Sequence, residues 1–192
     1  DGPWRRGLPH CEAEDGGDAI LGRCSLVDPS GAQYTGSILF GIKQGFGKLN
    51  KSNGETYIGF FSRGHFHGDD GILQGPHPLH KFVGAFQRGV RSGKGEQRFA
   101  NGCSYIGDWK DDLFHGQGVL NGIDGNFLNV ASGEWRRGLL EGFATMRWEG
   151  AHPMTYTGTW AKGCACGHGG ELVFADGRRF KGVFGPDAND DS

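Results

Sequence analysis

The sequence predicts an all-β protein, an elongated single-layer antiparallel β-meander built from about seven hairpin repeats. Three observations lead to this prediction. A glycine stands between two bulky residues in the pattern aromatic-x-Gly-x-aromatic, the pattern returns every 23 to 26 residues, and a Gly-rich segment ending in Asn-Gly or Asp-Gly follows it. Self-similarity at such a period is typical of a repeat architecture. The central glycines are Gly36, Gly59, Gly84, Gly107, Gly133, Gly158 and Gly182.

Each unit begins with a predicted strand, as residues 34–38 illustrate. Alternate residues of a strand share a face, so Tyr34, Gly36 and Ile38 point the same way. The glycine leaves a slot between two large side chains, which an aromatic ring of a neighbouring strand can cover. In the unit of Gly133, Ala131 stands in the first aromatic place.

A tight turn is predicted to end that strand. A glycine stands five residues after the central glycine in most units, behind a polar residue, as expected for the positive-φ position of a turn. Asp112 is the exception. The turn glycines are Gly41, Gly64, Gly89, Gly138 and Gly163.

A return strand rich in glycine and a second turn complete the unit. Gly45 and Gly47 illustrate the glycine pair of the return strand, and Asn53-Gly54 illustrates the second turn. Asn-Gly and Asp-Gly are strong hairpin signals, so each unit is read as two strands and two turns. A β-propeller needs longer blades and a β-helix would not place hairpin turns twice in each period, which makes both alternatives less favourable.

The composition argues against nucleic-acid binding and against a secreted, disulfide-rich protein. The chain has 20 Lys and Arg residues against 22 acidic residues, and it lacks dense basic tracts, so nucleic acid is not expected as a partner. Five cysteines at irregular intervals do not suggest a disulfide framework and favour a reducing cytosol. Both ends cut through a repeat, so we expect an excised part of a longer protein: an array over residues 1–185, with a degenerate first unit from Gly2, and an acidic tail over 186–192.

The pattern Tyr-x-Gly-x-Trp/Phe-x-x-Gly-x-x-x-Gly-x-Gly resembles the MORN repeat (membrane occupation and recognition nexus) over essentially the whole chain. The resemblance implies a single-layer β-meander that docks partner proteins or a second copy, and in some members phospholipids. MORN arrays also occur as cytoskeletal or ciliary scaffolds, so together with the cysteines we expect a cytoplasmic protein, with association with the cytoskeleton or a membrane as an option. MORN arrays also precede SET-type lysine methyltransferase and phosphatidylinositol phosphate kinase domains, so a regulatory part of a larger enzyme is an alternative.

Catalytic and metal chemistry is not expected within these residues. The Gly-x-Gly pairs lack the Lys-Ser/Thr ending and the helix of a phosphate-binding loop, and there is no nucleophile elbow. We therefore predict no enzyme activity and no cofactor. Cys164, Cys166 and His168 are weak zinc candidates, because their spacing is too short and a fourth ligand is missing. An incidental role in the repeat is favoured.

A row of cations is predicted along one edge of the sheet, just before the turn glycines. Such a row could meet anionic phospholipid headgroups, which makes peripheral membrane binding the main alternative function. Simple protection of the sheet edge is the competing interpretation. The residues are Arg6, Arg63, Arg88, Arg137 and Lys162.

The row of aromatic residues gives the main hypothesis, a non-catalytic scaffold that binds a protein segment or a second copy. A single-layer sheet cannot bury both faces in itself, so part of this row is expected to stay available to a partner. The alternative is that neighbouring repeats use the rings for their own packing. The predicted partner-binding residues are Tyr57, Phe61, Phe82, Phe86, Tyr105, Trp109, Trp135, Tyr156 and Trp160.

Overall fold

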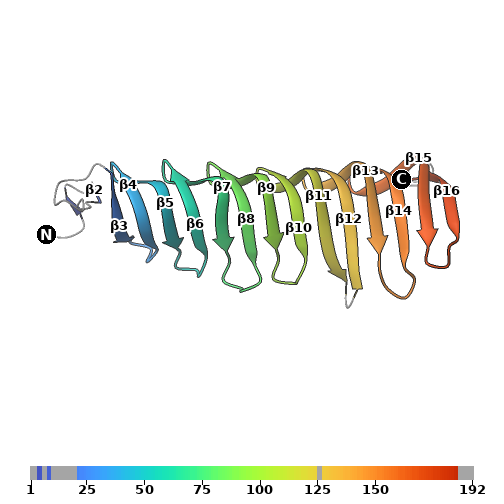
Figure 1. The fold of residues 1–192 in the computed structure, drawn as a ribbon, viewed down its shortest axis with the longest axis horizontal. Coiled ribbons are helices and arrows are strands. Elements are labelled where there is room, and N and C mark those ends of the chain that lie inside the picture. The colour runs from blue at the N-terminus through green and yellow to red at the C-terminus, as the bar shows by residue number, and fades with distance from the viewer. Residues whose placement is uncertain (1–3, 6–7, 10–20, 125–126, 186–192) are drawn as a thin grey trace, which may run out of the picture. The chain divides into compact units, whose positions relative to one another are not determined.

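The computed structural model describes residues 4–5, 8–9, 21–124 and 127–185 (Figure 1). It consists of two compact units, residues 1–100 and residues 101–192. The acidic tail predicted over residues 186–192 lies outside the described residues. Secondary structure in the described parts is entirely β, which confirms the predicted class.

In the first unit, the strands from β3 to β9 pair antiparallel in sequence order. A separate two-stranded sheet joins β1 (Trp4–Arg5) and β2 (Leu8–Pro9). The strands of the meander are β3 (Leu21–Val27), β4 (Gln33–Leu39), β5 (Ile42–Asn50), β6 (Thr56–Ser62), β7 (His65–Gln74), β8 (Lys81–Gln87) and β9 (Val90–Arg98).

The second unit repeats this architecture, again with antiparallel pairing in sequence order. Both units are open single-layer meanders, as the sequence predicts. The strands are β10 (Ser104–Lys110), β11 (Leu113–Asp124), β12 (Phe127–Arg136), β13 (Leu139–Trp148), β14 (Met154–Ala161), β15 (Cys164–Phe174) and β16 (Arg179–Phe184).

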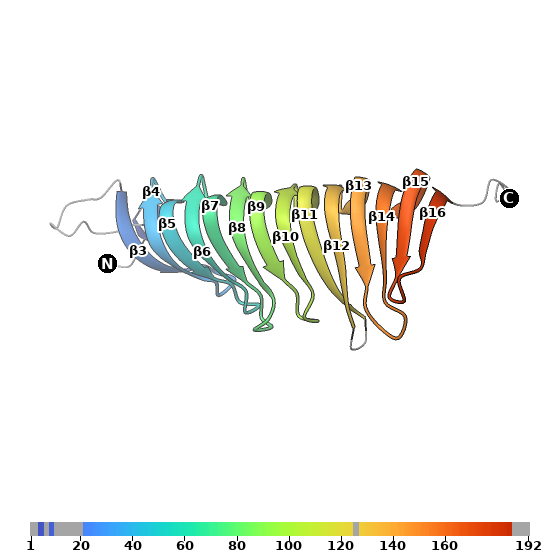
Figure 2. The same ribbon diagram turned by 45° about the vertical axis from the view of Figure 1, so that its right-hand side comes forward.

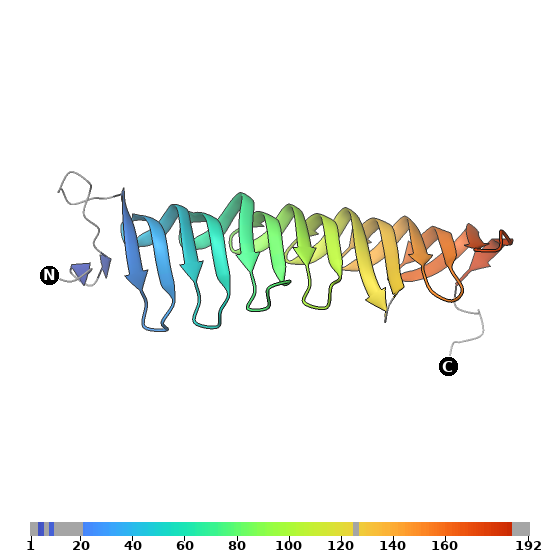
Figure 3. The same cartoon turned by 60° about the horizontal axis from the view of Figure 1, so that its bottom comes forward.

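The two faces of the sheet differ in every repeat. We call the side that bears the aromatic-x-Gly-x-aromatic rings the ring face, and the opposite side the open face. In β4, Tyr34, Gly36 and Ile38 are buried on the ring face, whereas Thr35 and Ser37 point to the open face. Figures 2 and 3 show that the strands of each unit are strongly curved. The core of the fold is therefore one side of a curved layer.

Rings from successive strands interlock on the ring face. Tyr57 meets Phe61 and Phe86 edge to face, with ring centroids 5.1 and 5.2 Å apart. Tyr105 meets Trp109 and Trp135 in the same way, at 5.3 and 5.6 Å. Such pairs contribute about 0.5–1.5 kcal/mol beyond the burial of their area. One repeat thus supplies the rings that cover the next.

The tyrosine hydroxyls are also satisfied by the fold. Each donates to the backbone carbonyl three residues later, as in Tyr34 Oη to Ser37 O at 2.7 Å and Tyr57 Oη to Phe60 O at 3.0 Å. Burial raises the pKa of Tyr34, Tyr57 and Tyr105 to about 12, because the phenolate would lose its hydration. These hydroxyls therefore pin the ring to its own strand.

Close approach of the ring to the backbone explains the regular glycines. A β-carbon on Gly59 would lie 2.5 Å from Tyr57 Oη, and one on Gly71 of the return strand would lie 2.9 Å from the same atom. Both distances are too short, so only glycine fits beneath the ring. The unit of Gly133 supports this explanation: Ala131 replaces the large ring, and Ala144 replaces the return-strand glycine in the space that becomes free.

The tight turns that follow the first strand have positive φ at both central residues. Arg63 and Gly64 have φ of 50° and 82°, and Asp111 and Asp112 have 51° and 65°. Two positive values are typical of a type I′ turn, which matches the twist of a hairpin. The Asn-Gly turns differ from the sequence interpretation, because only the glycine is left-handed there, as at Gly54 (86°). Asn-Gly, the stronger hairpin signal in the sequence, therefore does not form the type I′ turn here, whereas Arg63-Gly64 does.

Candidate interaction surface

The nine aromatic residues predicted to meet a partner are all buried, with 0 to 7% of each residue's surface exposed. The expectation that part of this row stays available therefore differs from the structure. The physical reason is that each ring lies between its own backbone glycines and the rings of neighbouring strands. The row packs the fold, as the competing interpretation held.

A second layer of side chains covers the first ring of the repeat. It comes from the position seven residues after the central glycine. Phe66 stacks on Tyr57 and Phe114 stacks on Tyr105, each with centroids 3.8 Å apart and planes 11° apart. In other units a cation takes this place: Lys43 Nζ lies 5.5 Å from the centroid of the Tyr34 ring.

Arg91 is the second cation in this position, 5.6 Å from the centroid of the Phe82 ring. Its Nη1 donates to Oε1 of Gln97 at 2.9 Å, and Gln97 Nε2 donates to the Arg98 carbonyl at 2.7 Å. Gln97 is almost fully buried on the ring face, opposite Phe82. These hydrogen bonds compensate for burying an amide among aromatic rings.

The open face of the first unit carries the exposed apolar side chains instead. Phe46 and Phe60, which are 50% and 56% exposed, form an edge-to-face pair with centroids 5.7 Å apart. They are directly paired across β5 and β6. Exposed aromatic pairs that do not complete the core are typical of interaction sites.

An open hollow of ≈ 510 Å³ adjoins Phe46. Its lining comes from three neighbouring strands, β3, β4 and β5. Most of its side chains point to the open face, including Ser25, Thr35 and Lys48, and two glycines form part of its floor. Because the floor is backbone, a partner side chain could approach the sheet closely. The lining residues are Cys24, Ser25, Thr35, Gly36, Phe46, Gly47 and Lys48.

The second unit has an equivalent hollow of ≈ 490 Å³ beside Phe143, which is 69% exposed. Ile106 and Val119 add exposed apolar surface on two adjacent strands, where they face each other. The hollow is lined by Gln117, Gly118, Val119, Ser132, Gly133, Phe143, Ala144 and Thr145.

Phe46 and Phe143 occupy the same place in their repeats, ten residues after the central glycine. The residue before each is a glycine with positive φ, Gly45 at 81° and Gly142 at 70°. The residue after each lies on the ring face, where the close approach of the strands demands a small side chain. The residue between is therefore directed to the open face and carries no packing role. The signal that could have found these residues is a large apolar side chain between a return-strand glycine and a small residue, as in Gly45-Phe46-Gly47 and Gly142-Phe143-Ala144.

Other residues in this position are exposed too. They are a pair of aspartates in β7 and single polar residues elsewhere, so the side chain at this point changes from repeat to repeat. These residues are Asp69, Asp70, Lys94, Gln117 and His168.

The predicted cations lie in the type I′ turns and are exposed within their units. They are Arg63 and Arg88 in the first unit, and Arg137 and Lys162 in the second. Arg6 lies outside the described residues. In the second unit the turns of β10–β11 and β12–β13 enclose a hollow of ≈ 350 Å³, lined by Lys110, Asp111, Leu113, His115, Arg136 and Arg137.

The cysteine and histidine candidates do not form a metal centre. In the described part of the chain, no group of three or more His, Cys, Asp or Glu side chains could hold a metal ion. Cys164 and Cys166 are free thiols, the first exposed and the second half-buried. Cys24 is disulfide-bonded.

The described residues contain no helix with the length and hydrophobicity required to span a bilayer.

Comparison with known families agrees with this geometry. The family model of the MORN repeat matches residues 34–56, 82–104, 105–127 and 132–150. The hairpin of Tyr57 falls outside these matches but has the same ring, hydroxyl and glycine contacts. No curated protein matches the chain. The family matches identify no catalytic domain. The chain is a member of the MORN repeat family, with its repeats across residues 34–150.

Proposed function

We propose that this chain is a non-catalytic interaction module that binds a protein segment along its open face. The observation that carries the proposal is the division between the faces. The aromatic rings of the ring face are buried against one another within the fold. Phe46, Phe60 and Phe143 instead stay exposed beside hollows that reach the backbone. Exposed apolar groups around a concave patch favour binding over simple solvation.

Surface variants test this proposal without disturbing the core. Phe46→Ser combined with Phe60→Ser should abolish capture of a protein partner, while the melting temperature changes little because both rings are already exposed. Leu79→Ser is the matched control, since Leu79 is an exposed apolar residue in the loop between β7 and β8. Equal capture by both variants would contradict the proposal.

A second copy of the chain is the other occupant to consider for this face. Size-exclusion chromatography with light scattering measures it directly. If the chain self-associates through the open face, the Phe46→Ser, Phe60→Ser variant becomes monomeric and the Leu79→Ser variant does not. A dimer that persists in the first variant would place the self-association elsewhere.

The hollow of ≈ 350 Å³ between turns of the second unit favours one alternative function, peripheral binding to an anionic membrane. Lys110, Arg136 and Arg137 line it and only Asp111 opposes them. Each cation near such a surface contributes about 1 kcal/mol. Flotation with anionic vesicles should then weaken as salt rises, and Arg136→Glu with Arg137→Glu should abolish it. Flotation that is unaffected by salt and by the two Glu substitutions would exclude this function.

A further inference from the structure

We propose that the partner of the first unit's open face is an acidic amphipathic helix, lying across strands β5 to β9. This rests on the proposed function and adds the partner's chemistry. The argument uses the side chains that the strand register places in two neighbouring rows of this face.

The central row is apolar between two polar ends. Register pairs Lys48 with Ile58, Ile58 with Ile72, Ile72 with Val83, and Val83 with Glu96. Adjacent strands lie about 4.8 Å apart, so the row spans roughly 19 Å from β5 to β9. Three consecutive β-branched residues form its middle, and the pair of Phe46 and Phe60 lies beside it.

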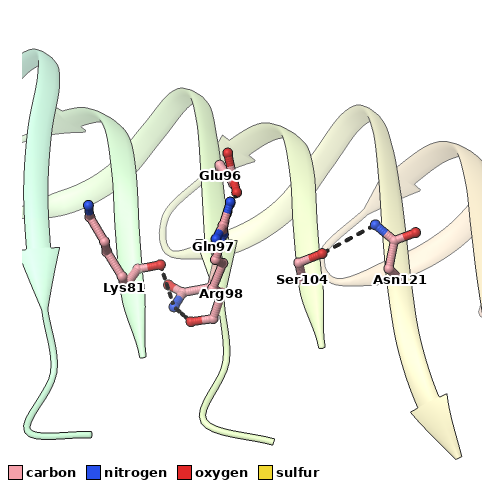
Figure 4. Close-up of polar contacts among 6 residues, drawn as sticks. All are labelled: Lys81, Glu96, Gln97, Arg98, Ser104 and Asn121. Atoms are coloured by element: carbon pink, nitrogen blue, oxygen red, sulfur yellow. Dashed lines mark hydrogen bonds and ion pairs between the residues drawn. The ribbon is translucent and has the colours of Figure 1, made fainter. Parts of the chain in front are cut away.

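Cations stand at both ends of this row. Lys48 is exposed and lines the hollow beside Phe46. At the β9 end, Lys81 and Arg98 are directly paired and line a hollow of ≈ 260 Å³ together with Val83 and Glu96. Figure 4 shows Lys81, Glu96 and Arg98 around this position.

The second row pairs Asn50 with Thr56, Thr56 with Gln74, Gln74 with Lys81, and Lys81 with Arg98. Glu96 is the acidic residue of these two rows, and the exposed Asp69 and Asp70 of β7 lie on the other side of the central row, toward Phe60. Arg98 Nε donates to Glu96 Oε1 at 2.8 Å. The two rows therefore carry one net positive charge at each end, from Lys48 in β5 and from Lys81 beside the Arg98–Glu96 ion pair of β9. A partner with carboxylates at both ends of an apolar stretch matches this pattern, whereas a second copy would bring like charges together.

A helix fits the face better than an extended strand. The strands β5 to β8 have both neighbours, so their backbone groups are already paired and a strand laid across them would gain no ladder hydrogen bonds. A helix satisfies its own backbone and offers an apolar stripe. At 1.5 Å per residue, roughly 13 residues cover the 19 Å between the cationic ends.

Three synthetic amphipathic peptides test the proposal with the full chain. All carry the same leucine stripe, and their flanking positions are Glu in the first, Gln in the second and Lys in the third. We expect the Glu peptide to bind tightest by fluorescence anisotropy. Lys48→Glu with Arg98→Glu should weaken that binding about tenfold, as two exposed ion pairs predict, and should reverse the preference toward the Lys peptide.

Arg137→Glu with Lys162→Glu is the matched control, because it makes the same change of charge at exposed turns of the other unit. Circular dichroism checks that every variant is folded. Equal affinity for the Glu and Lys peptides, or an equal loss in the control variant, would overturn the proposal.

The remaining outcomes separate the two proposals. If the three peptides bind alike and Phe60→Ser abolishes their binding, the open face binds proteins but not through charge, so only the acidic partner is refuted. If no peptide binds while a protein partner is still lost on Phe46→Ser with Phe60→Ser, the helix is refuted. If anionic vesicles bind in a Lys48-dependent manner and the peptides do not, the occupant is a lipid surface and this inference is wrong.

Discussion

The ring of Tyr105 occupies the space that a β-carbon on Gly118 would need, and its hydroxyl donates to the Asp108 carbonyl at 3.1 Å. Gly118 faces Gly107 across the β10–β11 pair. The ring of one strand therefore depends on a missing side chain in the next.

The first prediction concerns this dependence. Gly118→Ala should destabilise the chain by about 1–3 kcal/mol, because the methyl group forces the ring from its site. Combining it with Tyr105→Ala reproduces the natural pair of Ala131 and Ala144, so the two losses should overlap. Urea denaturation of the single and double variants should give a coupling energy of about 1–3 kcal/mol.

Gly122→Ala in the same strand is the control for this cycle. A β-carbon there would lie 3.8 Å from the nearest atom, Asn129 O, so its packing cost should be small. Strictly additive losses for Gly118→Ala and Tyr105→Ala would show that the ring and the glycine are not coupled.

The second prediction concerns backbone strain in the type I′ turns. Arg137 has φ of 52°, a conformation that costs most residues about 1–2 kcal/mol and that asparagine tolerates better. Arg137→Asn should therefore raise the unfolding free energy by up to about 1 kcal/mol. Arg136→Asn, one residue earlier in the extended strand β12, removes the same charge and should give no gain. Equal effects of the two changes would assign the result to charge.

The third prediction concerns alkaline pH. The folded pKa of Tyr34, Tyr57 and Tyr105 is raised to about 12 from an ordinary value of 10.0, and that of Tyr156 is also raised. The tyrosines of the unfolded chain lose their protons at lower pH than those of the folded chain. Their contribution to the unfolding free energy is therefore fully present below pH 10 and is lost as the pH rises toward 12.

Ultraviolet absorbance of tyrosinate measures this titration. Near pH 10 the folded chain should contain little tyrosinate, whereas the chain in concentrated urea should be about half ionised. Tyrosinate formation that follows one curve in both states would show that the hydroxyls are not protected by the fold.

The fourth prediction concerns the tryptophans. Trp135 Nε1 donates to the Gly118 carbonyl at 3.1 Å, so Trp135→Phe should lose about 1 kcal/mol of stability through that hydrogen bond. Trp135→Ala removes a buried ring and should cost about 3–5 kcal/mol. Thermal melts compare the two. A melting temperature unchanged by Trp135→Ala would mean that the ring is not part of the core.

Much of the fold could be predicted from spacing alone. The positions of Tyr34, Gly36 and Gly41 already imply a strand with one apolar face and a turn behind it, because strand alternation and positive φ leave few other solutions. The turn types were harder, since Asn53-Gly54 has the usual type I′ composition but Arg63-Gly64 forms that turn.

The interaction surface could not be predicted in the same way. Aromatic residues such as Trp109 are typical both of cores and of binding sites, and their sequence positions do not tell which role they take. The choice depends on how the curved layer packs ring against ring, a tertiary property. Phe46 was missed because it looks like an irregularity inside a glycine pair, although that pair is what turns it outward.

The Gly-x-Gly segments of the return strands have a consequence for how such a chain can change. Folding depends on the glycines and the rings, whereas the residue ten positions after the central glycine is exposed at Phe46, Asp69, Lys94, Gln117, Phe143 and His168. Phe46, Gln117 and Phe143 can thus be exchanged one at a time at little cost in stability. New binding specificities could then arise through single substitutions that leave the glycines and rings of the fold unchanged.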